Sequence, residues 1–206
     1  MFDFNTINNF DDHINKSIPG YSLLIDLIKS MSEYFYIEDM NIYDLGCSTG
    51  KLLKSLDTKC KKIGIDNSNL LPQETNFLND DLNNISNLDN ACIIYSIFTM
   101  QFLQPYKKYH YLKTIYNSLI KNGVLFLCEK VYQPIGKVQE IFSFSFYDFK
   151  SNNFTIDELF HKERDLRLNM KLLYEQDIIN MIKDIGFSSI TLFWQILNFK
   201  GYLIIK

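Results

Sequence analysis

The turn in the segment YDLGCSTG, residues 43–50, has the residue types of a site where a ligand approaches the backbone. Gly46 and Gly50 stand where an apolar strand pattern gives way to a helix pattern, and glycine leaves room there because it has no Cβ. Ser48 replaces the middle glycine of the dinucleotide pattern GxGxxG, so a pyrophosphate would meet a side chain. Asp44 is either a helix cap or an attraction for a cationic ligand group. The pattern argues against an ordinary dinucleotide site.

Two further acidic positions follow the next strands of the chain. Asp66 ends the pattern KKIGID, twenty residues after Gly46, where a carboxylate can accept hydrogen bonds from both hydroxyls of a ribose. Asp80 and Asp81 follow a presumed third strand, where a carboxylate can receive an adenine amino group. The alternatives are a polar turn at Asp66 and a solvated loop at Asp81. Because parallel strands end at one edge of a sheet, these positions together predict a nucleoside site at that edge.

Other chemistry-bearing residues give weaker signals. The segment 128–130, Cys-Glu-Lys, ends a central strand pattern, and we interpret it as a strand that becomes polar on reaching solvent. Arg164 and Arg167 stand three residues apart on a helix pattern, which usually indicates a solvated face. The four cysteines and three histidines show no metal-ligand spacing, so we expect no metal site.

The elements that must position these residues alternate between strand and helix. Apolar strand patterns and amphipathic helix patterns follow one another at residues 22–35 (helix), 40–45 (strand), 51–56 (helix), 61–66 (strand), 91–98 (strand), 106–120 (helix) and 124–130 (strand). Lys121, Asn122 and Gly123 are expected to stop the helix before them. The segment FSFSFYDF, residues 142–149, alternates like a strand, but its flanks and its place after a strand favour a helix.

The rest of the chain completes an α/β pattern. Two helices are expected between residues 156 and 185, and an antiparallel hairpin with a tight turn near residues 198–201 closes the chain. Alternating strands and helices predict a mostly parallel, doubly wound sheet. Two closing strands after five alternating ones resemble the seven-stranded Rossmann-like sheet of class I S-adenosylmethionine-dependent methyltransferases. Their cofactor has no phosphate, so Ser48 is less of an obstacle to it.

Composition sets the remaining bounds. A chain of 206 residues with 47% hydrophobic residues suits one domain, which we place at residues 1–206 with an N-terminal helical lid at residues 1–37. No apolar run approaches the roughly 20 residues of a membrane span, and the first residues lack a secretory pattern, so we expect a cytoplasmic protein. The net charge of −3 argues against direct binding of nucleic acid.

A set of motifs spread over almost the whole chain resembles the carboxy-S-adenosyl-L-methionine synthase family. The motifs are FDDHINKSIPGY, YDLGCS, IGIDNS, FTMQFL, CEKVY, YDFK, KERDLRLNM and WQILNFKG. The resemblance implies that prephenate loses carbon dioxide and water to give phenylpyruvate, while the S-adenosylmethionine methyl group is deprotonated to an ylide that captures the carbon dioxide. It also implies that the product serves a separate enzyme, which builds 5-oxyacetyl-uridine at the tRNA wobble position.

The resemblance also implies site residues and an assembly. It places cofactor contacts on Tyr21, Gly46, Cys47, Ser48, Asp66, Asn67, Asp81 and Leu82, and Asp44 fits the acidic position of such sites. Arg164 matches the arginine that binds the new carboxylate, a role that suits a planar guanidinium. The family implies a homodimer and no metal. Pro19 and Gly20 suit the two central positions of a type II turn, which would deliver Tyr21 to the cofactor.

Two features depart from the family pattern. Ile97 stands where the resemblance implies an asparagine, unless Ser96 takes over its contact, and only residues 67–75 separate the second and third strands. These departures keep a non-catalytic S-adenosylmethionine-binding protein open. A small-molecule S-adenosylmethionine-dependent methyltransferase on the same fold also stays open, and it would need a general base or a plain substrate pocket in place of the Arg164 carboxylate site. The acidic charge balance opposes a third, a direct tRNA methyltransferase.

Overall fold

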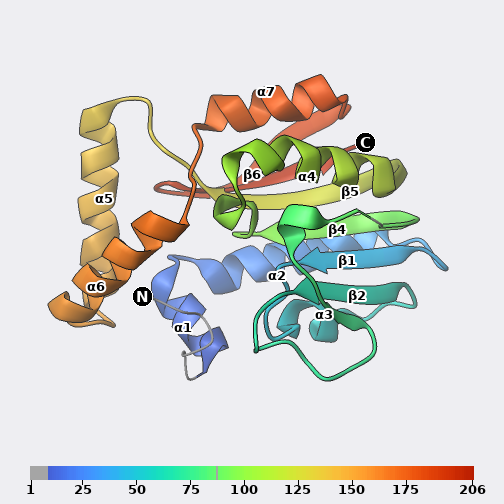
Figure 1. Ribbon diagram of the computed structural model, residues 1–206, viewed down its shortest axis with the longest axis horizontal. Coiled ribbons are helices and arrows are strands. Elements are labelled where there is room, and N and C mark those ends of the chain that lie inside the picture. The colour runs from blue at the N-terminus through green and yellow to red at the C-terminus, as the bar shows by residue number, and fades with distance from the viewer. Residues whose placement is uncertain (1–8, 87) are drawn as a thin grey trace.

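The computed structural model describes residues 9–86 and 88–206, and a seven-stranded sheet runs through its centre (Figure 1). The spatial order of the strands is β3-β2-β1-β4-β5-β7-β6. Their bounds are Asn41–Leu45 (β1), Lys61–Asp66 (β2), Phe77–Asn79 (β3), Ala91–Ile97 (β4), Leu119–Lys130 (β5), Ser189–Ile196 (β6) and Phe199–Ile205 (β7). All neighbours are parallel except β7, which runs antiparallel to both β5 and β6. The predicted doubly wound sheet with a closing antiparallel hairpin is confirmed.

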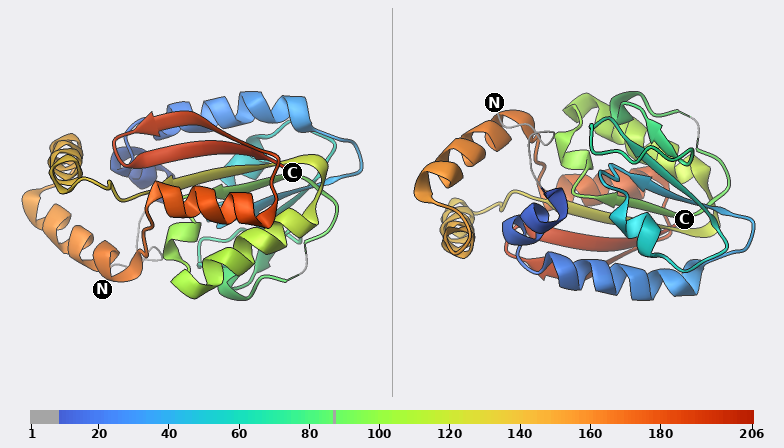
Figure 2. Two further views of the ribbon diagram at one scale, coloured as in Figure 1. Left: turned by 90° about the horizontal axis from the view of Figure 1, so that it is seen from above. Right: turned by 90° about the horizontal axis from the view of Figure 1, so that it is seen from below.

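Helices cover both faces of the sheet and extend past one edge (Figures 1 and 2). Their bounds are Phe10–Ser17 (α1), Tyr21–Ser32 (α2), Lys51–Ser55 (α3), Pro105–Ser118 (α4), Gly136–Ser151 (α5), Ile156–Asn169 (α6) and Glu175–Ile185 (α7). Helices α4 and α7 pack on one face, and α2 and α3 pack on the other. Helices α5 and α6 stand away from the sheet, beyond the ends of the parallel strands. The helix predicted for FSFSFYDF is confirmed within α5.

Strand β4 lies at the centre of the sheet and is buried on both faces. Six of its seven residues are buried, as expected for a strand covered on both faces. Tyr95 points to one layer and donates to Ser32 Oγ at 2.7 Å, whereas Ser96 points to the other and accepts from Tyr111 at 2.9 Å. These buried hydroxyls are therefore paired, which avoids the cost of unsatisfied polar groups.

The Pro-Gly turn lies between α1 and α2, as predicted. Gly20 has a φ of 72° and a ψ of 17°, and the Tyr21 backbone N–H donates to the Ile18 carbonyl at 3.2 Å. This is the geometry of a type II turn, which needs a positive φ at its third residue. The turn therefore starts α2 at Tyr21. The lid predicted for residues 1–37 includes residues 1–8, which lie outside the described part of the chain.

Two boundaries differ from the sequence prediction. Helix α4 ends at Ser118, and β5 begins at once at Leu119, before the expected stop at residues 121–123. Asn122 has a φ of 64° within β5, where the pairing with β4 shifts register, so these residues form an irregularity in the strand. The closing hairpin turns at Leu197 and Asn198, earlier than expected, because Gly201 already pairs with β5 and β6.

The connection between β2 and β3 is short, as the sequence indicated. Residues 67–76 join these parallel strands without a helix. A parallel connection usually contains one, so this side of the sheet is thinly covered. In the described part of the chain, no helix combines the length and the hydrophobicity that crossing a membrane requires.

Candidate functional site

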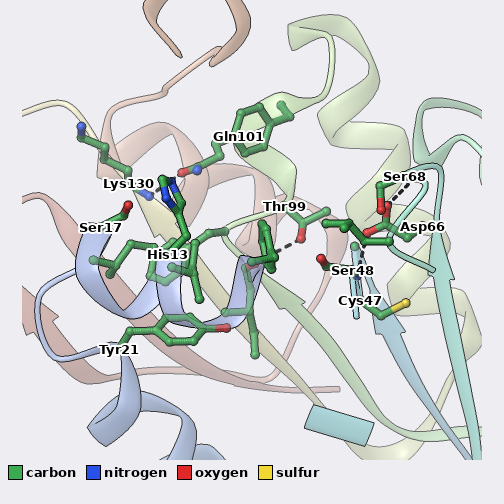
Figure 3. A pocket seen from close by; sticks show the side chains of 18 of the residues that line it. His13, Ser17, Tyr21, Cys47, Ser48, Asp66, Ser68, Thr99, Gln101 and Lys130 are labelled. Carbon is green, nitrogen blue, oxygen red and sulfur yellow. Dashed lines mark hydrogen bonds between the residues drawn. The ribbon is translucent and has the colours of Figure 1, made fainter. Parts of the chain in front are cut away.

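A cavity of about 830 Å³ opens at the carboxyl edge of the parallel strands (Figure 3). Its walls come from α1, α2, the loops after β1 to β4, the end of β5, and helices α5 and α6. Nine of the ten predicted site residues line it, namely Tyr21, Asp44, Gly46, Cys47, Ser48, Asp66, Asn67, Asp81 and Leu82. The structure brings these residues together as the sequence predicted; their contacts with a cofactor stay a prediction.

The glycine turn after β1 is held against its neighbours. The backbone N–H groups of Gly46 and Cys47 both donate to the Ile65 carbonyl, at 2.7 and 3.3 Å. Gly46 has a φ of 82°, and a Cβ on it would overlap the Thr99 side chain. A Cβ on Gly50 would overlap the Phe77 ring. Both glycines are therefore required by packing between loops, a reason that the sequence pattern did not reveal.

Asp66 is held in place by two backbone groups. Its Oδ2 accepts from the Ser48 N–H at 2.8 Å, and its Oδ1 accepts from the Ser68 N–H at 2.7 Å. Each carboxylate oxygen keeps a further lone pair, so the group can still accept two hydrogen bonds from the cavity. A vicinal pair of hydroxyls, as on a ribose, fits this acceptor. The alternative of a polar turn is also realised, because the same carboxylate fixes the turn at Ser68.

Two serine hydroxyls lie beside Asp66 in the cavity wall. Among the described residues, neither Ser48 Oγ nor Ser68 Oγ has a hydrogen-bond partner, although both atoms are buried. Both residues line the cavity. Ser48 also has a φ of 49°, which is uncommon for a residue with a side chain. Buried hydroxyls without a protein partner next to a cavity are available to a polar ligand or to water at this end.

Asp44 supplies a buried acid at the centre of the cavity wall. Its side chain is almost inaccessible, with 5% of the residue exposed. Burial, with a smaller effect of the nearby Asp66 charge, raises the pKa of Asp44 to about 7. Helix α3 is preceded by Gly50 and has no side-chain cap, so the helix-cap interpretation of Asp44 is wrong. A cationic ligand group near Asp44 would stabilise its carboxylate form.

Asp81 and Leu82 form the wall after β3. Asp81 Oδ1 accepts from the backbone N–H and the side-chain amide of Asn83, both at 2.9 Å, and so caps the short 3₁₀ helix η3 (Leu82–Asn84). Leu82 is 8% exposed and presents an apolar side chain. The Asp81 carboxylate suits the polar edge of an aromatic base, and the neighbouring Leu82 side chain suits its apolar face.

Aromatic side chains form part of the cavity wall. Tyr21 follows the Pro-Gly turn, and its ring centroid lies 6.4 Å from that of Phe98. Phe98 in turn packs edge-on against Phe199, at 5.7 Å between ring centroids. Burial, followed by the Asp44 charge, raises the pKa of the Tyr21 phenol well above its usual range. Tyr21 therefore stays a neutral hydroxyl that can donate a hydrogen bond.

Sequence reasoning missed the basic end of the cavity. Lys130, Lys150 and Lys162 line it together with His13 and Glu163. The strand end at residues 128–130 does not reach solvent, contrary to our interpretation, because Cys128 and Glu129 are 0% and 2% exposed and Lys130 faces the cavity. The signal that could have found it is the lysine in each of the motifs CEKVY, YDFK and KERDLRLNM.

Arg164 is the predicted site residue that the structure does not bring to the cavity. It is exposed on α6 and is absent from the cavity lining, whereas Lys162 and Leu166 of the same helix line it. Ile97, which stands where the resemblance implies an asparagine, lines the cavity and leaves this position apolar. Ser96 does not compensate, because its hydroxyl pairs with Tyr111 on the opposite face of the sheet.

The cavity thus has two ends of opposite charge. Asp44, Asp66 and Asp81 form an acidic end that suits a nucleoside carrying a positive charge, and the lysines form a basic end that suits an anion. In the described part of the chain, no three His, Cys, Asp or Glu side chains are arranged to hold a metal ion.

Comparisons with known proteins identify relatives of this chain. No family model matches the chain. Carboxy-S-adenosyl-L-methionine synthase of Staphylococcus epidermidis is 33% identical over 98% of this chain and 94% of its own length, and that of Shewanella halifaxensis is 31% identical over 100% and 92%.

Solved structures agree in fold. A SAM-dependent methyltransferase from Archaeoglobus fulgidus aligns with a TM-score of 0.65 and 10% identity over 97% of this chain and 100% of its own. Magnesium protoporphyrin IX methyltransferase from Synechocystis, solved with bound SAM, aligns with a TM-score of 0.59 and 11% identity over 98% of this chain and 93% of its own. The chain is an enzyme with a class I methyltransferase fold, and it belongs to the carboxy-S-adenosyl-L-methionine synthase family.

Proposed function

We propose that this enzyme transfers a carboxyl group from prephenate to the methyl group of S-adenosyl-L-methionine, giving carboxy-S-adenosyl-L-methionine, phenylpyruvate and water; the water takes up the hydroxyl group lost by prephenate and the proton lost by the methyl group. The observation that carries the proposal is the single cavity with an acidic and a basic end, in a chain similar over its full length to synthases of this name. A cationic cofactor and an anionic donor would each find a complementary end. The two reactants would then meet between them.

The acidic end would hold the cofactor. Asp66 would accept the two ribose hydroxyls, Asp81 the adenine amino group, and Leu82 would contact the base. When bound, S-adenosyl-L-methionine supplies a methyl group on a positively charged sulfur, and that charge makes the methyl protons more acidic. Asp44 would balance the positive charge, and Tyr21 would orient the methionine end by a hydrogen bond from its phenol. The cavity residues suit this cofactor because they offer acceptors and no phosphate cradle.

The aromatic side chains of the cavity would exclude water from the transfer. Tyr21, Phe98, Phe146 and Phe199 all line the cavity, and Phe146 and Phe199 lie against Lys130 at its basic end. Carbon dioxide released from the donor must meet the cofactor methyl group before water or diffusion removes it. An apolar wall favours that outcome, because it keeps the reactants close and excludes water.

The role proposed for Arg164 requires a second subunit. Its guanidinium would bind the new carboxylate, yet Arg164 is exposed and does not line the cavity of its own chain. We propose a homodimer in which Arg164 reaches the partner's cavity. Large apolar side chains exposed on α5 and α6 support a contact there, namely Ile141, Phe144, Ile156, Phe160 and Leu168.

The proposed product would serve a second enzyme that modifies the wobble uridine of tRNA to its 5-oxyacetic acid form. This chain would then act on small molecules in the cytoplasm and need no direct contact with tRNA. Its net charge of −3 supports that division of labour, because binding to a phosphate backbone usually needs a basic surface.

Mass spectrometry of the bound nucleotide tests the proposal. The purified protein is incubated with S-adenosyl-L-methionine, with and without prephenate. We expect a prephenate-dependent gain of one carboxyl group and the release of phenylpyruvate. Formation of S-adenosylhomocysteine with another acceptor would instead identify a methyltransferase, and an unchanged cofactor under all conditions would identify a binding protein.

A further inference from the structure

Gln101 is a cavity residue that the proposed function leaves without a role. It belongs to the motif FTMQFL and lies in the short 3₁₀ helix η4 (Met100–Phe102), which follows β4. Only 5% of the residue is exposed, and it lines the cavity. Figure 3 shows Gln101 and Lys130 on the side of the pocket away from Asp66. A buried carboxamide needs partners for both its oxygen and its nitrogen.

The end of β4 explains where the carboxamide oxygen is held. Strand β4 pairs with β5 as far as Ile97, which lies opposite Cys128. The Phe98 N–H still donates to the Cys128 carbonyl at 2.7 Å, but Phe98 has a φ of 54° and the chain then turns off the sheet. The backbone N–H of Lys130 in β5 donates instead to Gln101 Oε1 at 3.0 Å. The side chain therefore takes the place of a strand carbonyl.

This hydrogen bond fixes the orientation of the carboxamide. A backbone N–H can only donate, so the atom that faces Lys130 is the oxygen, and Nε2 takes the other position. Within residues 9–86 and 88–206, Gln101 Nε2 makes no hydrogen bond, and it is not among the enclosed polar atoms that lack a partner. The nitrogen is therefore open to the cavity, with two N–H groups to donate.

The backbone of Gln101 is tied as well as its side chain. The Lys171 N–H donates to the Gln101 carbonyl at 2.6 Å, and the Lys171 carbonyl accepts from the buried ammonium of Lys108 in α4. The Nε2 donor is therefore carried by a loop that is held by β5, by α4 and by the chain after α6. A donor that is fixed before its ligand arrives loses little freedom on binding.

The order of the strands places Gln101 beyond the proposed cofactor site. Along the edge β3-β2-β1-β4-β5, Asp81 follows β3, Asp66 ends β2 and Asp44 lies in β1. A cofactor with its adenine at Asp81 and its ribose at Asp66 would bring its positively charged sulfur to Asp44. The carboxyl donor must then approach the methyl group from the part of the cavity at β4 and β5. Gln101 follows β4, so it lies on the donor's side of the cavity.

The polar groups of the donor match a fixed N–H. Prephenate carries two carboxylates and a keto oxygen, which only accept hydrogen bonds at neutral pH, and one hydroxyl group. A side chain that recognises the carboxylates must therefore donate. The hydrogen bond from an amide to a carboxylate is charge-assisted and is stronger than one to a neutral oxygen, so a carboxylate is the preferred partner of Nε2.

We propose that Gln101 recognises the carboxyl donor: Nε2 donates to a carboxylate oxygen of prephenate, while Oε1 stays on the Lys130 backbone N–H. The inference rests on the proposed function and names a specificity-determining contact within that site. The contact discriminates by the direction of the hydrogen bond. An acceptor at the position of Nε2 would face a carboxylate oxygen with no hydrogen atom between them, and prephenate would be rejected.

Reversing the direction of this hydrogen bond tests the inference. Gln101→Glu keeps an oxygen for the Lys130 N–H and replaces the Nε2 donor by a second oxygen. We expect the KM for prephenate to rise by about tenfold or more, with no loss of affinity for S-adenosyl-L-methionine. Gln176→Glu is the matched control, because it adds the same charge at an exposed position of α7 outside the cavity. This control should keep the parent KM.

The pH dependence of KM separates this contact from a merely structural role. The new carboxyl group of Gln101→Glu is buried, and its protonated form can still donate a hydrogen bond. Its defect in KM, relative to the parent enzyme, should therefore grow from about pH 6 to about pH 8 as the group ionises. Gln101→Met loses the amide without adding a titratable group, so its defect should stay constant over the same range.

Two results would overturn the contact. One is a parent KM for prephenate in folded Gln101→Glu at the upper end of the pH range. The other is a loss of affinity for S-adenosyl-L-methionine by the same factor as for prephenate, which would indicate a general distortion of the cavity. If Gln101→Glu does not fold, KM and cofactor affinity in Gln101→Met decide in the same way.

The proposed function and this inference fail in different ways. Titration of prephenate into the protein loaded with S-adenosylhomocysteine, which has no methyl group to react, measures donor binding without turnover. If the parent enzyme binds prephenate but forms no carboxylated cofactor, the proposed function is wrong, and weaker binding in Gln101→Glu still supports the contact. If the parent enzyme makes the product and Gln101→Glu does so with the same KM, the function stands and the contact is wrong.

Discussion

Asp44 is the residue whose charge state should govern cofactor binding. Its pKa is about 7 in the cofactor-free protein, because the side chain is buried near Asp66. A positively charged cofactor binds the carboxylate form better than the acid form. Asp44 becomes protonated as the pH falls through 7, so the affinity for S-adenosyl-L-methionine should decline by up to about tenfold per pH unit below that value.

Isothermal titration calorimetry at pH values from about 5 to about 8, a range that spans the Asp44 pKa, measures how the affinity for S-adenosyl-L-methionine depends on pH. Asp44→Asn is the matched variant, since it keeps the shape and removes the charge. We expect weaker binding at pH 8 and a flat profile below pH 7 in the variant. An equal slope in the parent enzyme and the variant would assign the titration to another group.

Gly46 offers a second prediction, because packing explains its place in the turn. Gly46→Ala adds a Cβ that meets Thr99 and strains a residue with a φ of 82°, at a cost of about 1–2 kcal/mol for the backbone conformation alone. The turn and Ser48 should shift, and cofactor affinity should fall. Gly136→Ala is the control, since nothing lies within 4 Å of its added Cβ.

A substitution of Thr99 tests whether its contact with the added Cβ causes the loss of affinity. Thr99→Ala in the Gly46→Ala background removes Oγ1 and Cγ2, the two atoms closest to the new Cβ, so we expect a partial recovery of affinity and of melting temperature. A double variant no better than Gly46→Ala would show that backbone strain, and not the contact with Thr99, sets the loss.

At the scale of elements, the sequence predicted the order of strands and helices but not all of their ends. Strands β1, β2 and β4 were recognisable because each has a run of buried, mainly apolar residues, as expected for strands covered on both faces. The end of α4 was misplaced because Asn122 and Gly123 look like a helix stop. In the fold, the same residues form an irregularity inside β5.

The acidic end of the cavity was predictable and the basic end was not, for a physical reason. Gly46, Asp66 and Asp81 follow successive strands, so strand order alone places them at one edge. Lys130, Lys150 and Lys162 come from a strand end and two helices that stand off the sheet, and no local pattern relates them. Their proximity depends on where α5 and α6 lie.

Helix α1 should respond to the cofactor as a lid. Asp11 accepts from Thr49 Oγ1 at 3.0 Å, and Ser17 accepts from Lys162, so α1 joins the body through residues that line the cavity. Only Ser17 is buried in the helix. With S-adenosyl-L-methionine at a concentration of 100 times its Kd, amide hydrogen exchange in α1 should slow by up to about a hundredfold.

Exchange in α7 serves as the internal control, because this helix does not line the cavity. Mass spectrometry of peptides from both helices measures the two rates in one sample. Unchanged exchange in α1 at a saturating cofactor concentration would contradict the lid, and equal slowing in α7 would indicate a general stabilisation.

At the scale of the whole molecule, the Arg164 side chain points away from the cavity of its own chain, which favours a site shared between two subunits. Lys162 and Leu166 line the cavity, and Arg164 stands two residues from each. At about 100° per residue, a position two residues away points to the opposite side of a helix. Arg164 is exposed there, beside the apolar side chains of α5 and α6, so it can serve a second copy of the chain and not its own cavity.

Mixing two inactive variants tests this arrangement. Asp66→Ala removes the ribose acceptor from one chain, and Arg164→Ala removes the carboxylate ligand from the other. If Arg164 acts across the dimer, half of the sites in a mixed dimer contain both residues, so random mixing should restore about a quarter of the parent activity. If Arg164 acts within its own chain, every site lacks one residue and no activity returns. A mixture of Asp66→Ala with Asp44→Asn is the negative control, because both residues belong to the same cavity and no exchange of subunits can complete it.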